Sequence, residues 1–263
     1  MSKDIIRQVT TLIAIIATIT INILANDLPL NGQTAAELSA RYPVPITPPG
    51  YAFSIWSLIF IGLISFAVYQ ALPAQRANPR LRRAGYLVVL SCIANCSWIF
   101  LWHYNFVNLS LVAMIGILLT LIAIYLRLET GRTTVSLAEG WLVRAPFSIY
   151  LGWVSLAAIV NTAVVLYNLN WNGWGISDAV WTAIMLAVGA VLAMVVMLRR
   201  ADIAYGLVFV WAFVGIAVKN AASPTIVFAA GLFALLVGLV ALWQVIRNRG
   251  FNLSQGVQPA QRA

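Results

Sequence analysis

Residues 42–60 read Tyr42-Pro43-Val44-Pro45-Ile46-Thr47-Pro48-Pro49-Gly50-Tyr51-Ala52-Phe53-Ser54-Ile55-Trp56-Ser57-Leu58-Ile59-Phe60, and this stretch decides the fold of the chain. Four prolines within the seven residues 43–49 remove backbone N–H donors and impose an extended approach. The tandem Pro48-Pro49 then pre-sets the first turn of a helix. The stretch therefore predicts a rigid loop that leads directly into an apolar helix.

Three aromatic residues stand at the mouth of this helix, namely Tyr51, Phe53 and Trp56. We expect Tyr51 near the lip and Trp56 about a turn and a half inside the helix. Such an arrangement can form a site for a flat apolar ligand. Aromatic residues at a membrane–water interface give the same pattern, so spacing alone leaves both interpretations open.

The composition places the chain in a membrane. Of its 263 residues 62% are hydrophobic and 9% charged, and the mean hydropathy is +0.91, which leaves too little polar surface for a water-soluble globule. Continuous apolar runs without period-2 alternation favour an all-α integral membrane protein over a β-barrel. Runs near the ~20 residues that span a bilayer predict eight transmembrane helices: Ile5 to Ala25, Tyr51 to Leu72, Ala84 to Trp102, Leu109 to Leu126, Phe147 to Tyr167, Ala179 to Leu198, Ile203 to Val218 (the shortest) and Thr225 to Ile246.

The net charge is +9, and the distribution of its Lys and Arg residues between the loops indicates which side of the membrane each loop faces. With eight spans and an N-terminus inside, fourteen of the 16 Lys and Arg residues lie on the cytoplasmic side, and only Arg41 and Lys219 lie outside. We therefore expect both termini in the cytoplasm, with the protein in a bacterial inner membrane. The charge implies contact with the lipid bilayer and no nucleic-acid partner.

Turn residues and tryptophans between Asn168 and Gly175 interrupt the hydrophobic pattern and mark the best candidate boundary. We expect a five-helix part over 1–170, a three-helix C-terminal extension over 171–250 and a disordered tail over 251–263. The connection 127–145 is expected to be a solvated linker.

Polar residues inside the predicted spans are few. Asn22, Asn95 and Asn161 are expected to join neighbouring helices through side-chain hydrogen bonds. Cys92, Cys96 and His103 offer too few ligands on one helix for a metal site, so none is expected. The spans contain no carboxylate pair for acid–base chemistry, which argues against a hydrolase or a metalloenzyme.

The residues resemble the TspO/translocator protein family, the tryptophan-rich sensory proteins, over about residues 5–170. Three segments carry the resemblance, in matching order and spacing: Pro48-Pro49-Gly50-x-x-Phe53-x-x-Trp56-x-x-x-Phe60, then Asn95-x-x-Trp98, and finally Pro146-Phe147-x-x-Tyr150-Leu151-x-Trp153-Val154-x-x-Ala157-x-x-x-Asn161 before Leu169-Asn170.

This resemblance implies a five-helix bundle with a pocket closed by the first outer loop, which binds porphyrins or haem and, in some members, sterols. No cofactor is required, and a porphyrin or haem would be the ligand. The resemblance implies a non-enzymatic role, although light-dependent porphyrin breakdown is reported for some relatives. The ligand-binding residues that it implies are Pro48, Pro49, Tyr51, Phe53, Trp56, Asn95, Trp98, Tyr150, Trp153 and Asn161.

The chain also departs from the family pattern. Ile46 stands where the family commonly has tryptophan, and Tyr167 is followed by Asn168 rather than a basic residue. The helices after residue 178 lie outside the usual five-helix family. There Lys219 is expected to extend to the outer surface, or alternatively to pair with a ligand carboxylate.

Two functions of different class follow from the sequence. The first is a membrane sensor or carrier that binds a planar hydrophobic ligand, expected to be a tetrapyrrole, in a tryptophan-lined pocket. The second is a transporter or a permanent subunit of a membrane complex, including a homodimer, in which the extra helices form a path or an interface. Small residues such as Gly206, Gly231 and Gly238 suit the second function.

Overall fold

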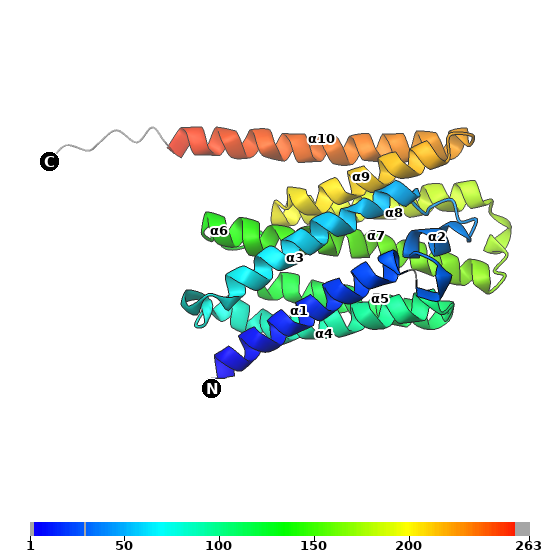
Figure 1. Cartoon of the computed structure of the whole chain (residues 1–263). Coiled ribbons are helices and arrows are strands. Elements are labelled where there is room, and N and C mark those ends of the chain that lie inside the picture. The colour runs from blue at the N-terminus through cyan, green and yellow to red at the C-terminus, as the bar shows by residue number, and fades with distance from the viewer. Residues whose placement is uncertain (1–2, 29, 256–263) are drawn as a thin grey trace.

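The computed structural model describes residues 3–28 and 30–255, with side chains up to residue 247, and this part of the chain is helical and contains no strand (Figure 1). The long helices are α1 (Lys3–Asp27), α3 (Ile55–Ala71), α4 (Pro79–His103), α5 (Val107–Arg127), α7 (Ala145–Asn168), α8 (Asp178–Arg200), α9 (Ile203–Lys219) and α10 (Pro224–Gln255). Shorter elements connect them: η1 (Leu30–Gly32), α2 (Ala35–Ala40), η2 (Gly50–Ser54), η3 (Pro73–Gln75), α6 (Leu137–Glu139), the π-helix η4 (Gly140–Arg144) and η5 (Gly173–Gly175).

Seven helices of the described residues are long and apolar enough to cross a membrane, and α9 is a shorter apolar helix. The seven agree with seven of the predicted spans. Helix α9 corresponds to the predicted span at Ile203, and its 17 residues measure about 25 Å at ~1.5 Å per residue. The protein is thus an all-helical integral membrane protein.

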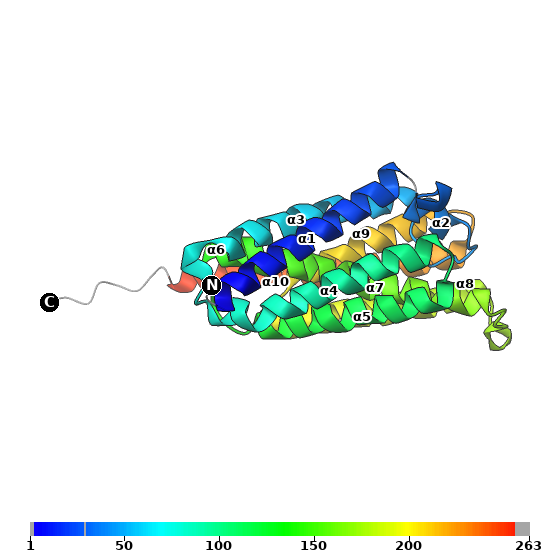
Figure 2. The same ribbon diagram turned by 60° about the horizontal axis from the view of Figure 1, so that its bottom comes forward.

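Helices α1, α3, α4, α5 and α7 form a closed bundle (Figure 2). Going round it, α1 packs on α4, α4 on α5, α5 on α7, α7 on α3, and α3 again on α1. Helix α7 has buried residues on most of its surface, since it also contacts α9. An interior is therefore enclosed between five helices that come from the first 168 residues.

Helices α8, α9 and α10 pack against one another and join the bundle mainly through α9 and α7. Gly152 permits this close approach, because a Cβ there would lie only 2.9 Å from the carbonyl oxygen of Tyr205. Helix α10 lies along the outside of α8 and α9 (Figure 1). The division of the chain near residue 170 into two parts stays a prediction.

The two ends of the molecule differ in chemistry. One end, called here the loop end, carries residues 30–54 with α2, and the opposite end, called the arginine end, carries α6 (Figure 1). At the arginine end three ion pairs join α4 to other segments. The paired atoms are Arg80 Nε and Glu139 Oε1 at 2.6 Å, Arg82 Nη2 and Asp4 Oδ2 at 2.6 Å, and Arg83 Nη2 and Glu129 Oε1 at 2.9 Å.

The connection 127–145 is more ordered than the solvated linker that the sequence predicts. Glu139 and Arg144 are both buried. Arg144 donates from Nη2 to the Leu128 carbonyl oxygen (3.0 Å) and to Thr133 Oγ1 (2.6 Å). The expectation was wrong for these residues because a charged side chain that finds an ion pair or carbonyl acceptors can be buried.

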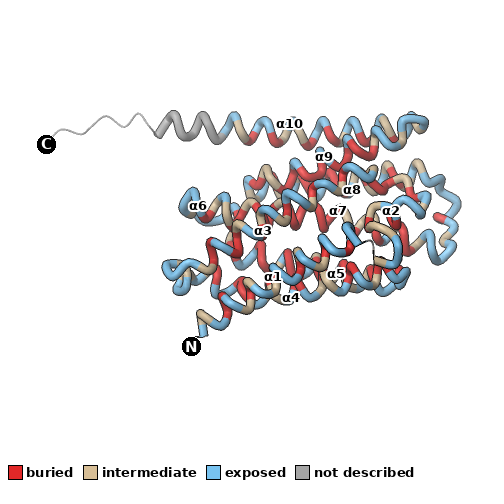
Figure 3. The backbone as a smooth tube through the Cα atoms, in the orientation of Figure 1, coloured by how far each residue is buried: buried red, intermediate tan, exposed pale blue. Residues whose placement is uncertain are grey.

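The long helices have exposed outward surfaces (Figure 3), and many of the side chains exposed there are large and apolar. Ile61 of α3, Val112 of α5 and Leu198 of α8 are all more than half exposed. Such surfaces suit lipid tails as the surrounding solvent.

Helix α10 extends to Gln255, into the segment 251–263 that the sequence predicts to be disordered, and residues 256–263 lie outside the described part.

Candidate functional site

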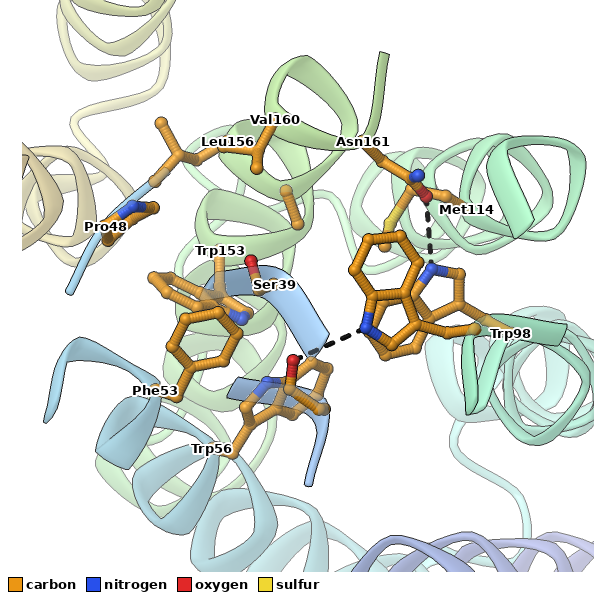
Figure 4. A pocket seen from close by; sticks show the side chains of 13 residues that line it. Ser39, Pro48, Phe53, Trp56, Trp98, Met114, Trp153, Leu156, Val160 and Asn161 are labelled. Atoms are coloured by element: carbon orange, nitrogen blue, oxygen red, sulfur yellow. Dashed lines mark hydrogen bonds between the residues drawn. The ribbon is translucent and has the colours of Figure 1, made fainter. Parts of the chain in front are cut away.

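A small apolar cavity lies inside the five-helix bundle at its loop end (Figure 4). Its free volume is about 50 Å³. Helices α2, α3, α4, α5 and α7, together with η2 and the proline-rich stretch, contribute its walls. The lining residues are Ala35, Ser39, Pro48, Phe53, Trp56, Trp98, Trp102, Met114, Trp153, Leu156, Ala157, Val160 and Asn161.

Aromatic rings form two opposing parts of the wall (Figure 4). On one side, Phe53 meets Trp153 edge to face, with ring centroids 5.8 Å apart, and Trp56 lies beside them. On the other side, Trp98 and Trp102 are stacked at 5.7 Å with an angle of 15° between their planes. Stacked and edge-to-face pairs are the favoured arrangements of aromatic rings, so these walls are well packed without a ligand.

The indole N–H groups of Trp98 and Trp102 donate hydrogen bonds to oxygen atoms of the protein. Trp98 Nε1 donates to Asn161 Oδ1 at 3.2 Å, and Trp102 Nε1 donates to the Ala35 carbonyl oxygen at 3.4 Å. Asn161 in turn donates from Nδ2 to Ser110 Oγ at 3.2 Å. These two tryptophans therefore present ring faces to the cavity, while their polar atoms hold α4 to α7 and α2.

A second polar chain lies behind Trp56, outside the cavity wall. Asn22 donates to Asn95 Oδ1 at 2.8 Å, and Asn95 donates to the Tyr150 hydroxyl oxygen at 3.0 Å. The Tyr150 ring meets Trp56 edge to face at 5.8 Å. The chain joins α1, α4 and α7 and sets the position of Trp56 from behind, in keeping with the predicted helix-joining role of Asn22 and Asn95.

The roof of the cavity comes from the loop end. Helix α2 begins with a capping box, in which Thr34 Oγ1 accepts from the Glu37 N–H (3.2 Å) and Glu37 Oε2 accepts from the Thr34 N–H (2.8 Å). The second bond holds the pKa of Glu37 below its usual range. Tyr42 lies over Trp102, with ring centroids 5.9 Å apart, and burial raises the pKa of its hydroxyl.

Helix α9 holds the proline-rich part of the roof through three backbone carbonyls. Lys219 Nζ donates to Thr47 O (3.0 Å), Asn220 Nδ2 to Pro45 O (3.0 Å) and Trp211 Nε1 to Ala52 O (3.1 Å). The four prolines of residues 43–49 limit backbone pairing in this stretch, so Pro45 O and Thr47 O accept from side chains at the end of α9. Ala52 O, in η2, accepts from the Ile55 N–H as well as from Trp211. The C-terminal helices supply these side-chain donors.

Packing reinforces these hydrogen bonds. The Tyr51 ring meets Trp211 edge to face at 5.8 Å. Gly215 leaves room for Pro49, because a Cβ at position 215 would lie 3.1 Å from Pro49 Cδ. Tyr51 and Pro49 thus contact α9 and do not line the cavity.

Comparison with protein families agrees with this architecture. A family model described as TSPO-like protein matches residues 8–243. The chain belongs to the TSPO-like protein family. The match extends through α8 and α9 into α10, so the C-terminal helices fall within it, beyond the 5–170 over which the sequence motifs resemble the family. Neither the proteins of curated function nor the solved structures include a match to this chain.

In this TSPO-like protein, part of the predicted ligand-binding set surrounds the cavity. The predicted residues that line it are Pro48, Phe53, Trp56, Trp98, Trp153 and Asn161. The predicted residues that lie elsewhere are Pro49 and Tyr51 against α9, and Asn95 and Tyr150 behind Trp56.

Several lining residues were missed, and helical spacing could have found most of them. Trp102 follows Trp98 by four positions on α4, and Ala157 and Val160 follow Trp153 on one face of α7. Ala35 and Ser39 belong to α2, a short helix within the long loop whose start is marked only by the Thr34-x-x-Glu37 capping signal.

Within the described residues, no group of three or more His, Cys, Asp or Glu side chains could hold a metal ion. Cys92 and Cys96 are free, and Cys96 Sγ lies 3.6 Å from Thr18 Oγ1. His103 is fully buried, and its Nδ1 is 2.7 Å from the Ile99 carbonyl oxygen one turn earlier. Cys96 thus contacts α1 from α4, whereas the His103 ring is bonded within α4.

Proposed function

We propose that this protein is a membrane sensor or carrier that binds a planar hydrophobic ligand, a tetrapyrrole such as porphyrin or haem, in the tryptophan-lined cavity. The observation that carries the proposal is the convergence of Trp56, Trp98, Trp102, Trp153 and Phe53 on one apolar cavity beneath the loop end. Flat conjugated rings stack well on such walls, and apolar, aromatic-lined cavities are typical ligand sites. We propose binding without catalysis and without a required cofactor.

The size of the cavity bears directly on how a ligand would be admitted. Its free volume is about 50 Å³, whereas small-molecule sites usually measure roughly 300–1,000 Å³. A tetrapyrrole therefore needs the roof to lift or the indoles to rotate. We propose that the structure is the closed form of the protein. In this form the aromatic side chains occupy the space that a tetrapyrrole would take.

We also propose a topology of eight crossings with both termini in the cytoplasm of a bacterium. Helix α9 supports the eighth crossing, because its first residues lie near Asp202, which bonds Tyr125 at the arginine end, and its last residue bonds Thr47 at the loop end. The Lys and Arg asymmetry then makes the arginine end cytoplasmic. The ligand cavity would open on the outer side of the inner membrane.

A second candidate function is that of a subunit in a membrane complex or a homodimer, with or without transport. Gly231 and Gly238 on α10 favour it, since a Cβ at either position would meet nothing within 4 Å among the described residues. Outward-facing small residues on a membrane helix permit close contact with another helix. Cross-linking through a cysteine placed at Gly238 would test this candidate directly.

A porphyrin titration tests the main proposal. The detergent-purified full chain is titrated while its tryptophan fluorescence is followed, beside a Trp56→Leu/Trp153→Leu double variant and a Trp243→Leu control. Trp243 lies on α10, where Arg247 stacks over its ring at 5.0 Å. Stacking contributes on the order of 0.5–1.5 kcal/mol per aromatic pair, so we expect the double variant to bind roughly ten- to a hundredfold more weakly.

The control variant should bind like the wild type and differ only in its starting fluorescence. Equal affinity in all three proteins would overturn the proposed site. A wild type without saturable binding would overturn the proposed ligand class and leave the complex-subunit candidate ahead.

A further inference from the structure

A second and larger cavity, called here the groove, lies between α5, α7 and α8, toward the arginine end. Its free volume is about 460 Å³, against about 50 Å³ for the tryptophan-lined cavity. The lining contains no tryptophan. The lining residues are Leu118, Ile122, Tyr125, Leu126, Leu151, Ser155, Ala158, Ile159, Thr162, Val188, Leu192, Val196, Arg200 and Tyr205.

The groove is left open because α8 packs only lightly on the five-helix bundle. Helix α8 packs mainly on α9 and α10 and only lightly on α7. One stripe of α8 faces the opening, with Val188, Leu192, Val196 and Arg200 at successive steps of four residues. This stripe is about 18 Å long at ~1.5 Å per residue, which is more than half of the ~30 Å hydrocarbon core of a bilayer.

The rim of the groove is open to the bilayer. Ile122 and Leu126 on α5 and Val188 and Leu192 on α8 are exposed apolar side chains on its two sides. Its floor contains a polar pair, in which the Tyr205 hydroxyl donates to Ser155 Oγ at 3.1 Å. A ligand could therefore enter sideways from the lipid phase, without passing through water.

A positive charge stands at one end of the groove. The Arg200 guanidinium lies 5.9 Å from the centroid of the Tyr125 ring, and its Nη1 donates to the Thr130 carbonyl oxygen at 3.3 Å. In the part of the chain that the structure describes, no carboxylate oxygen lies within ion-pair distance of Arg200. Since a guanidinium has five N–H donors, most of them are free for a ligand.

The nearby carboxylate does not compete for this charge. Asp202 accepts from three donors: the Tyr125 hydroxyl (2.9 Å), Ser148 Oγ (2.6 Å) and the Tyr205 N–H (3.1 Å). Its oxygens face α5 and α7 beneath the groove. The end of the groove at Arg200 is therefore suited to an anion.

We propose that this groove binds an anionic phospholipid from the leaflet at the arginine end, with its phosphate at Arg200 and one acyl chain along the α8 stripe. The apolar lining, its opening to the bilayer and the unpaired cation together specify an amphipathic anion whose chain comes from the membrane. Basic pockets between transmembrane helices bind such headgroups. The site is separate from the tryptophan-lined cavity and does not depend on its ligand.

Native mass spectrometry of the delipidated full chain tests the proposal, with phosphatidylglycerol and phosphatidylcholine of identical acyl chains as probes. We expect phosphatidylglycerol to bind the wild type roughly fivefold more tightly, the effect of about one cation near a headgroup. Arg200→Gln should abolish this preference, and Arg200→Lys should retain part of it. Ile159→Phe, which fills the groove, should weaken both lipids.

Arg199→Gln is the matched control, because Arg199 is the adjacent exposed arginine and does not line the groove. It should keep the wild-type preference. Equal losses in the Arg199 and Arg200 variants would show diffuse surface attraction and overturn the site. Unchanged binding in Ile159→Phe, or tighter binding of a free fatty acid than of phosphatidylglycerol, would overturn the proposed occupant.

Discussion

Lys219 Nζ donates a hydrogen bond to the carbonyl oxygen of Thr47, 3.0 Å away and 172 positions distant in sequence. The bond joins the last residue of α9 to the proline-rich roof of the cavity. The sequence suggested that Lys219 extends to the outer surface or pairs with a ligand carboxylate. Lys219 is exposed at the loop end, and its ammonium bonds a backbone carbonyl there. The C-terminal helices thereby hold the roof of a cavity whose walls they do not form.

Replacing Lys219 should loosen this roof. A hydrogen bond from a charged donor is worth about 1.5–3 kcal/mol, so Lys219→Met should increase amide exchange in residues 44–52, as measured by hydrogen–deuterium exchange, and should speed the release of a bound porphyrin. Arg41→Gln is the control, because Arg41 is the other basic residue of the loop end and is exposed. Equal exchange in wild type and Lys219→Met would contradict the proposed restraint.

Gly215→Ala should act on the same roof through packing. Its new Cβ would lie 3.1 Å from Pro49 Cδ, whereas a Cβ at Gly116 on α5 would lie 3.6 Å from Ala94 Cβ, an ordinary contact. Gly to Ala in a helix otherwise gains up to ~1 kcal/mol, so Gly116→Ala should raise the Tm slightly. Gly215→Ala should fail to do so, and Gly215→Leu should lower the Tm by an overpacking cost of about 1–3 kcal/mol. A Gly215→Leu protein as stable as the wild type would show that the roof moves aside freely.

Asn95→Leu should reduce stability far more than ligand affinity. The substitution leaves Asn22 and the Tyr150 hydroxyl without their shared partner, and such groups cost roughly 1–3 kcal/mol when buried. Asn95 lies behind Trp56 and not in the cavity wall. Thermal unfolding in detergent, beside a porphyrin titration, separates the two effects.

Asn26→Leu provides the control for these two measurements, because among the described residues the Asn26 side chain bonds only the Asn22 carbonyl oxygen, at 2.8 Å on its own helix. A large loss of affinity in Asn95→Leu at unchanged Tm would mean that ligand reaches the second polar chain.

Reporter fusions test the eight crossings. Fusions after Arg83, Arg144 and Arg200 should report the cytoplasm, and fusions after Asn172 and Ala222 should report the outer side, since the basic residues gather at one end. The fusions after Arg200 and Ala222 test whether the shorter helix α9 crosses the membrane, because they lie on either side of it in the sequence. If both report the same side, α9 does not cross and the C-terminus lies outside.

Local sequence signals predicted the helices well, because continuous apolar runs and charged breaks are properties of neighbouring residues. They also predicted that Phe53 and Trp56 share a site. Phe53, in the 3-10 turn η2, and Trp56, in the first turn of α3, both line the cavity, while Tyr51 contacts Trp211. The sequence predicted a transmembrane helix from Tyr51 onward, whereas residues Gly50–Ser54 form a tighter 3-10 turn before α3 begins.

The roof restraint could not be read from the sequence. Lys219, Asn220 and Trp211 form no motif, and their partners are carbonyl oxygens, which every residue has. Only the packing of α9 on α7 brings the two segments together. The same holds for the groove at Arg200, which depends on the light packing of α8 on α7.

The use of carbonyl acceptors in the roof has an evolutionary consequence. Any residue at positions 45, 47 and 52 presents the same oxygen, provided that the backbone keeps its course, whereas the donors on α9 are specific side chains. Among descendants of this sequence, the roof should tolerate substitutions at these three positions that preserve side-chain size at the buried Thr47 and Ala52. Positions 211, 219 and 220, far from any ligand, should vary little, and changes there should coincide with loss of the prolines.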